Sequence, residues 1–303
     1  MIRVSRNAID RISEAVIFAV ALVAIALIFL IFIYVGREAL PLLTGNAEGL
    51  SLASPFNAPY VWQPVSNVPK YNVFPLIIGT VKVTIISMLI AVPLALAAAL
   101  YTAEFARPRL REWIKPAIEL LAGIPSVVLG FFALMVLAAW VQAAFHGAYR
   151  LNALTAGIAL AFAIIPIIYT VSEDAMTAVP RLYREASLAL GASKGQTAVR
   201  VVLPAAIPGI AAAIVLGFGR AIGETMIVLM VSGNSATLSL NPALPVRTLS
   251  ATIAAEMAEA VVGSGHYRIL FFIGVLLFLI TAVLNSVGDR FNRKLRERLF
   301  GSA

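Results

Sequence analysis

Six long apolar segments run through this chain of 303 residues, and they limit its possible folds more than any other feature. They cover about residues 15–36, 76–101, 118–143, 153–173, 203–231 and 267–288. A helix needs about 20 apolar residues to cross the hydrocarbon core of a bilayer. The segments reach that length without the alternation of apolar and polar residues that marks barrel strands. The sequence therefore predicts an all-α fold: a polytopic membrane helix bundle with six transmembrane helices.

The overall composition agrees with a membrane protein. Hydrophobic residues make up 61% of the chain, against roughly 45–50% in soluble domains, so much of the surface must face lipid. The first apolar segment exceeds the length of a signal-peptide core and lacks a small-x-small cleavage site, so we interpret it as a retained span. The chain has no cysteine, which excludes disulfides and thiol catalysis.

The net charge of +8 is distributed unevenly between alternate loops. The positive-inside rule then places both termini in the cytoplasm. A nucleic-acid-binding protein would instead gather its basic residues on one soluble face. The predicted cytoplasmic segments hold Arg3, Arg6, Arg11, Arg107, Arg109, Arg111, Lys115, Arg181, Arg184, Lys194, Arg200, Arg290, Arg293, Lys294, Arg296 and Arg298; the opposite side holds Arg37, Lys70, Arg150, Arg247 and Arg268.

The chain reads as a single transmembrane domain, 1–303, with a core at about 76–288. Two predicted outside loops, at about 36–75 and 232–266, are too short for separate domains. The first is rich in Pro and Asn, and we expect it to be ordered. The second contains a stretch at 248–260 whose composition favours a short helix.

A polar, glycine-punctuated segment at about 178–204 separates the fourth and fifth apolar segments. It predicts a helix from about Arg181 to Leu190, a break at Gly191 and a second helix from about Lys194. Such a bent bracket outside the bilayer is suited to binding a partner protein.

Charged residues inside apolar segments indicate function, because burying a charge in the bilayer costs roughly 2.5 to 3.5 kcal/mol. Arg220 lies deep in the fifth segment, and Glu224 follows four residues later, so the two are expected to share a helical face and form an ion pair. The pair could select phosphate, since a guanidinium binds an oxyanion and a carboxylate accepts the hydrogenphosphate proton. It could equally fix helix packing, because Gly219 and Gly223 form a GxxxG pattern. Lys82 lies near one end of its span and is read as snorkelling to the interface.

No catalytic motif in the sequence occurs in the structural context that its chemistry needs. Residues 191–195 fit GxSxG, but they lie in the polar bracket and lack the strand-to-helix elbow of a nucleophile. There is no metal-ligand motif and no phosphate-binding GxxxxGK[ST]. We therefore expect no catalytic residue, no metal site and no cofactor on this chain, and any ATP to be bound by another polypeptide.

Residues 185–204 resemble the EAA loop of ABC importer permeases, which implies a type I ABC importer permease fold. In that family the loop docks on the ATPase subunit. The matching positions here are Glu185, Ala186, Gly191, Leu203 and Pro204.

A longer resemblance, from about Trp62 to Asn285, is to the C-type permease of phosphate-specific ABC transporters. It is carried by AEFA (103–106), IELLAGIPSVV (118–128), GRAIGETMIVLMVSGN (219–234), PVRTLSATIA (245–254) and GHYRILF (265–271). The resemblance implies that Arg220 and Glu224 line the substrate pathway. It also implies a bacterial or archaeal plasma membrane location and four kinds of partner: an A-type permease, two ATPase subunits that bind ATP and Mg, an extracytoplasmic phosphate-binding protein, and membrane lipid. Permeases for sulfate or molybdate, and a phosphate-signalling scaffold, remain alternatives.

Overall fold

The computed structural model describes residues 6–42, 44, 56, 60–66 and 68–300. Six helical stretches in these ranges are long and apolar enough to cross a membrane, which confirms the predicted number. The helices are α1 (Arg6–Ala39), α2 (Phe74–Leu100), α3 (Pro108–Ala122), α4 (Ser126–Phe132), α5 (Ala138–Phe145), α6 (Ala153–Thr177), α7 (Arg181–Ala189), α8 (Lys194–Thr197), α9 (Leu203–Gly223), α10 (Met226–Val231), α11 (Leu249–Glu256) and α12 (Gly265–Phe300). Strands β1 (Trp62–Gln63) and β2 (Lys70–Tyr71) pair antiparallel.

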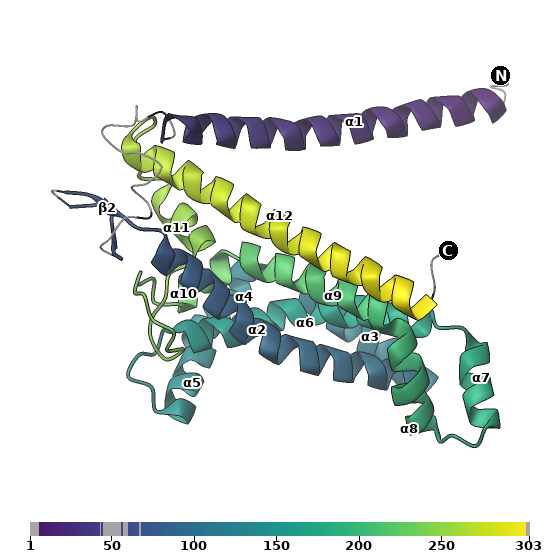
Figure 1. Cartoon of the computed structure of the whole chain (residues 1–303). Helices are drawn as coiled ribbons and strands as arrows, with labels where there is room; N and C mark the ends of the chain where they lie inside the picture. The colour runs from purple at the N-terminus through teal and green to yellow at the C-terminus, as the bar shows by residue number, and fades with distance from the viewer. Residues whose placement is uncertain (1–5, 43, 45–55, 57–59, 67, 301–303) are drawn as a thin grey trace, which may run out of the picture.

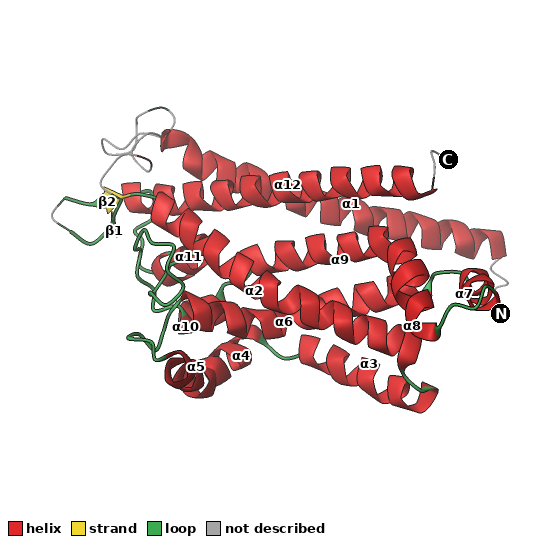
Figure 2. Cartoon of the chain, turned by 60° about the horizontal axis from the view of Figure 1, so that its bottom comes forward, coloured by secondary structure: helices red, strands yellow, loops and turns green. Residues whose placement is uncertain are grey.

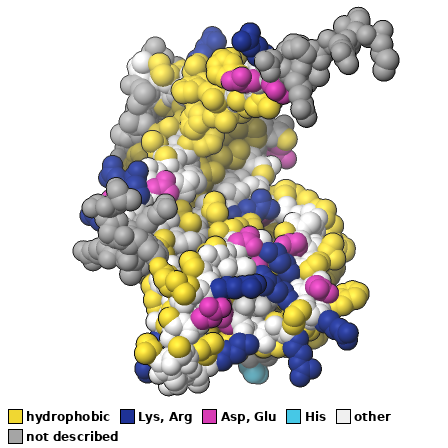
Figure 3. Space-filling view, turned by 90° about the vertical axis from the view of Figure 1, so that its right-hand side faces the viewer, with side chains coloured by type: hydrophobic (Ala, Val, Ile, Leu, Met, Phe, Trp, Pro, Cys, Tyr) yellow, Lys and Arg dark blue, Asp and Glu magenta, His cyan; other side chains and the backbone are white. Residues whose placement is uncertain are grey.

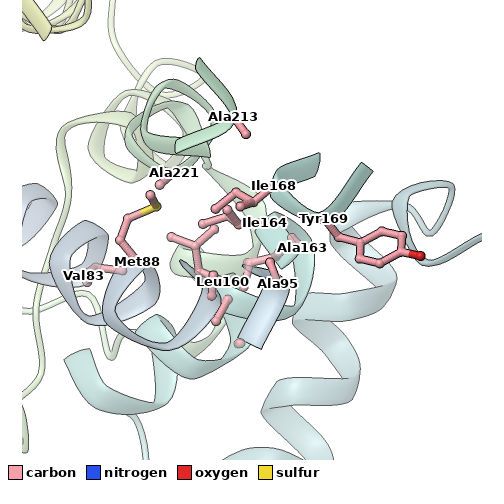
Figure 4. Packing of buried hydrophobic residues seen from close by; sticks show 14 of the residues in the cluster. Val83, Met88, Ala95, Leu160, Ala163, Ile164, Ile168, Tyr169, Ala213 and Ala221 are labelled. Carbon is pink, nitrogen blue, oxygen red and sulfur yellow. The ribbon is translucent and has the colours of Figure 1, made fainter. Parts of the chain in front are cut away.

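The core of the bundle lies where α6 packs between α2 and α9 (Figure 4). Leu160, Ile164 and Ile168 of α6 are fully buried there. The facing side of α2 carries alanines four residues apart, at Ala91, Ala95 and Ala99, all completely buried. Small side chains at this spacing let membrane helices approach closely, so packing rather than hydrophobicity holds the three helices together.

Within the described residues, the ring contacts of the first span, α1, with the bundle lie near its C-terminal end. Phe32 lies against Phe278 of α12 with ring centroids 4.7 Å apart, and Tyr34 lies edge-on to Phe271 at 5.7 Å. Farther toward its N-terminus α1 diverges from α12 (Figure 1). In the most hydrophobic 18-residue stretch of α1 no residue is buried, so most of this helix presents apolar side chains to its surroundings.

Two ends of the bundle can be distinguished (Figures 1 and 2). The α7 end carries α7, α8, the start of α1 and the end of α12. The α11 end carries α11, the hairpin and the loop at 232–248. The short helix predicted at 248–260 is confirmed as α11. Of the predicted outside loop at 36–75, most of 43–59 lies outside the described residues.

The third predicted span begins in the wrong place. The apolar run starts at about 118, but residues 118–122 belong to α3, and the membrane-length stretch begins at Ser126. Pro125 has extended backbone angles (φ −57°, ψ 136°) and caps α4. Proline lacks an amide hydrogen, so it starts a helix more readily than it continues one. The chain therefore breaks between Gly123 and Ser126.

The fifth predicted span is also interrupted. The sequence predicts one helix over 203–231, but α9 ends at Gly223 and α10 begins at Met226. Glu224 between them has extended angles (φ −68°, ψ 129°). Its free carbonyl accepts a hydrogen bond of 2.8 Å from Ser250 Oγ of α11. Irregular backbone inside a membrane is tolerated where neighbouring protein satisfies it in this way.

Candidate functional site

The helix break at Glu224 determines the geometry of the predicted Arg220–Glu224 pair. The structure brings the two side chains together, with a guanidinium nitrogen of Arg220 3.8 Å from Glu224 Oε2. They do not lie on one helical face as expected, because α9 ends before Glu224. Glu224 is buried, with 6% of its side chain exposed, whereas Arg220 is 54% exposed. A charge-assisted hydrogen bond is about 2.7–2.9 Å long, so this pair is loose.

The Arg220 guanidinium is otherwise uncommitted. Within the described part of the chain it donates no hydrogen bond. The packing alternative also finds little support, since an added Cβ at Gly223 would meet nothing within 4 Å and one at Gly219 would meet only the Asn285 amide oxygen at 3.7 Å. Among the described residues, the GxxxG pattern therefore makes no close contact with another helix. Arg220 presents free, forked donors on an exposed surface of an apolar span, a chemistry suited to binding an oxyanion.

Lys82, the other basic residue inside a span, does not snorkel to solvent as predicted. It is 8% exposed, and its ammonium donates to the backbone carbonyls of Ser239 at 2.9 Å and Asn241 at 3.1 Å. The same loop accepts hydrogen bonds from the first amides of α6. Lys82 thus fixes the loop at 232–248 against the bundle, and its role is structural.

The predicted shape of the polar bracket, two helices with a bend at Gly191, is confirmed. Helix α7 covers Arg181–Ala189, Gly191 has φ +84°, and α8 starts at Lys194. Only glycine adopts that left-handed backbone without strain, which explains the Gly at the bend. Ser193 of the GxSxG motif forms a capping box with Gln196 and so begins α8, a structural use of its hydroxyl.

The five predicted docking residues fall into two groups. Glu185, Ala186 and Gly191 are exposed on the bracket, and no hydrogen bond or ion pair within the described residues involves the Glu185 side chain. Leu203 and Pro204 are half-buried and form the first turn of α9, where a proline is well tolerated. The first group is available to a partner, whereas the second shapes the entry to the fifth span.

Two ion-pair clusters at the α7 end were not predicted from the sequence. Glu173 of α6 is completely buried and accepts hydrogen bonds from Arg111 and from Lys115 at 2.9 Å. Lys115 also binds the exposed Asp174 at 2.8 Å. These hydrogen bonds, to Asp174 first and then to Glu173, raise the pKa of Lys115 above its ordinary value. The cluster fastens α3, none of whose residues is buried, to α6.

The second cluster joins α7 to the long helices. Arg184 of α7 binds Glu104, which follows α2 in a π-helical turn at Tyr101–Phe105, at 2.7 Å. Figure 3 shows the α7 end face-on, with basic and acidic side chains gathered together over its lower half. Sequence reasoning missed both clusters because their partners lie 58 to 80 residues apart along the chain.

Known proteins resemble this chain in sequence and in fold. Residues 91–300 match the family described as "Binding-protein-dependent transport system inner membrane component". The probable ABC transporter permease protein YqgH of Bacillus subtilis is 38% identical over 268 residues, covering 88% of this chain and 85% of that protein. The phosphate transport system permease protein PstC of Mesorhizobium japonicum is 34% identical over 309 residues, covering 94% of this chain and 93% of its own length.

Solved structures agree at the level of fold. A bacterial alginate ABC transporter chain matches with a TM-score of 0.65 at 15% identity, covering 94% of this chain and 97% of that one. A chain of the MetNI methionine ABC transporter in an inward-facing conformation matches with a TM-score of 0.54 at 20% identity, covering 74% and 94%. The predicted ABC importer permease fold is confirmed by these matches. Together with the family match over residues 91–300, they establish that the chain belongs to the family of binding-protein-dependent transport system inner membrane components.

Proposed function

We propose that this chain is the C-type permease subunit of an ATP-driven importer that moves inorganic phosphate inward across the plasma membrane. The observation that carries the proposal is the uncommitted Arg220 guanidinium, 54% exposed in an apolar span, with the buried Glu224 carboxylate 3.8 Å away. Its forked donors suit a tetrahedral oxyanion. The carboxylate can accept the proton of hydrogenphosphate, which sulfate lacks at neutral pH, so the pair favours phosphate. The names of relatives such as the Mesorhizobium PstC support the same substrate.

The proposed assembly contains the partners that this chain needs for active transport. ATP and Mg are bound by two copies of an ATPase subunit, and the exposed bracket at Glu185, Ala186 and Gly191 is the surface that one copy contacts. An A-type permease completes the pathway beside Arg220. A phosphate-binding protein delivers substrate at the α11 end. The family description, which names binding-protein-dependent transport, supports this arrangement.

The orientation follows from charge. The α7 end carries most of the basic residues of the described chain, so we place it in the cytoplasm of a bacterial or archaeal cell, with both termini on that side. In operation, ATP closes the ATPase dimer, the bracket transmits that movement, and the helices open toward the α11 end to accept phosphate. Phosphate then passes Arg220 on its way inward. This chain itself performs no covalent chemistry.

The proposal is tested by transport in vesicles that contain this chain, its A-type partner, the ATPase and the binding protein. We expect ATP-dependent accumulation of radiolabelled phosphate that excess sulfate or molybdate does not inhibit. Vesicles with an ATPase unable to hydrolyse ATP serve as the control and should accumulate none. Inhibition by sulfate or molybdate as strong as by unlabelled phosphate would favour a permease for another oxyanion. Absence of any uptake, with phosphate signalling intact in cells, would favour the scaffold.

A further inference from the structure

Helix α7 is attached to the rest of the chain by few polar contacts. None of its residues is buried, and it projects beyond the ends of α9 and α12 (Figure 1). Ser187 joins it to α8 through a hydroxyl pair 2.9 Å apart, with Thr197 as the partner. All other side-chain hydrogen bonds of α7 within the described residues come from Arg184. The connection between α7 and the spans therefore depends strongly on this one side chain.

Arg184 reaches two different helices at once. Its Nε and Nη2 donate to the carboxylate of Glu104, at 3.0 and 2.7 Å, just beyond the end of α2. Its Nη2 also donates to the carbonyl of Met176 at 2.8 Å, and its Nη1 donates to the carbonyl of Val179. Met176 lies in the last turn of α6 and Val179 lies just after it, where backbone carbonyls lack partners within the helix. One guanidinium thus joins α7, the end of α2 and the end of α6.

The contact between Arg184 and Glu104 is largely shielded from water. The side chains of Arg184 and Glu104 are only 20% and 7% exposed, so salt and water weaken their attraction less than they would at the surface. A forked arginine contact also fixes orientation, which a lysine cannot do. The neighbouring residue, Glu185, is exposed and has no such contact within the described chain. Adjacent positions on α7 therefore face in different directions, one toward the bundle and one toward the outside.

We propose that Arg184 is the positioning residue that makes α7 and the ends of α2 and α6 move as one body. A displacement of α7 by an ATP-driven partner would then reach the spans directly through Arg184. The inference rests on the proposed function only in requiring an ATPase on α7. It does not depend on which substrate is carried, so its failure can be told apart from failure of the phosphate assignment.

The first test measures movement without substrate. The chain lacks cysteine, so spin labels can be placed through Tyr101→Cys at the end of α2 and Leu190→Cys at the end of α7, which are 48% and 90% exposed. Pulsed electron–electron double resonance then gives the distance between the two spin labels in the complete complex with cysteine-free partners. We expect the distance distribution to stay unchanged when ATP is added. With Arg184→Ala in addition, we expect it to shift or broaden on ATP binding.

The second test measures coupling. Uptake per ATP hydrolysed should fall at least fivefold in Arg184→Ala, with partial recovery in Arg184→Lys, while the ATPase still co-purifies. Arg109→Ala is the matched control, because Arg109 is exposed and has no hydrogen bond within the described residues. If the Arg184→Ala protein does not accumulate in cells, the spin-label distance and the uptake per ATP are measured in Glu104→Gln and Arg184→Lys instead. An ATP response of the labels identical to that of the parent, or unchanged uptake per ATP in the variants, would overturn the proposal.

Discussion

The buried carboxylate of Glu173 gives the most quantitative prediction of the structure. Its side chain is 0% exposed and accepts hydrogen bonds from Arg111, from Lys115 at 2.9 Å and from the Thr177 hydroxyl at 3.0 Å. Helix α3 buries none of its own residues, so apart from the partly buried Ile114 and Ile118, which pack against the core, its attachment to α6 relies on this ion-pair cluster. Glu173→Gln preserves the size of the side chain and removes the charge. It also turns a hydrogen-bond donor toward two cations.

The expected cost follows from the exposure of the partners. Removing one member of a fully buried ion pair costs about 3–5 kcal/mol. Arg111 and Lys115 are 36% and 30% exposed, so water partly solvates them once the carboxylate is lost. We therefore expect Glu173→Gln to lower the free energy of unfolding by about 2–3 kcal/mol. For a chain of 303 residues, with an unfolding entropy of about 2.1 cal/mol/K per residue, that corresponds to a fall of about 3–5 °C in the thermal midpoint.

The assay is thermal unfolding of the purified chain in detergent, followed by tryptophan fluorescence, with Asp174→Asn as the matched control. Asp174 binds the same lysine at 2.8 Å but is 61% exposed. A surface pair of that kind contributes only about 0–1 kcal/mol, so the control should shift the midpoint little. Equal shifts for the two variants, or a larger one for Asp174→Asn, would refute the argument that burial makes Glu173 important.

Three further predictions concern the packing of α2, the charge of Lys115 and the docking of Glu185. Gly79→Ala should lower the thermal midpoint, because the new Cβ would lie 2.1 Å from the Arg247 carbonyl oxygen, whereas Gly36→Ala, with nothing within 4 Å, should not; equal midpoints would contradict the close packing of α2. The raised pKa of Lys115 means that its stabilisation is complete below pH 10.5 and is lost only as the pH rises through the folded-state pKa. The midpoint difference between the parent and Lys115→Met should therefore be constant from about pH 6 to 9 and shrink in stronger base, and a difference that changes near neutrality would contradict this. Glu185→Lys should prevent co-purification of the ATPase or abolish uptake, and normal transport by this variant would remove Glu185 from the docking surface.

The sequence predicted best what depends on local composition. Apolar length alone placed six spans, and the turn residues around Gly191 placed the bracket, because both signals lie within a short stretch of chain. Hydropathy does not report whether a helix is continuous, so the breaks before Ser126 and at Glu224 were missed. Pro125 carried a signal for the first break. The break at Glu224 is preceded only by Gly223 as a local signal. The carbonyl that this break leaves free is satisfied by Ser250, 26 residues away.

Contacts between distant residues could not be predicted from one sequence. Lys82 looks like an interfacial lysine until the loop at 232–248 folds over it and offers two carbonyls. Arg184 and Glu104 are 80 residues apart, and neither is distinguished from other charged residues in its loop. The candidate site was identified because an arginine inside an apolar segment is conspicuous by itself. Its exposure, and the looseness of its ion pair, required the structure.

The central claim is that Arg220 lines the substrate pathway, and it is tested most directly by measuring phosphate uptake and ATP hydrolysis in the same reconstituted vesicles. The parent complex is compared with Arg220→Gln and with the control Arg109→Ala, each with the binding protein present. We predict that Arg220→Gln abolishes uptake while ATP hydrolysis and assembly persist, and that the control matches the parent. Loss of both activities together would assign Arg220 to helix packing instead, and unchanged uptake would contradict the claim outright.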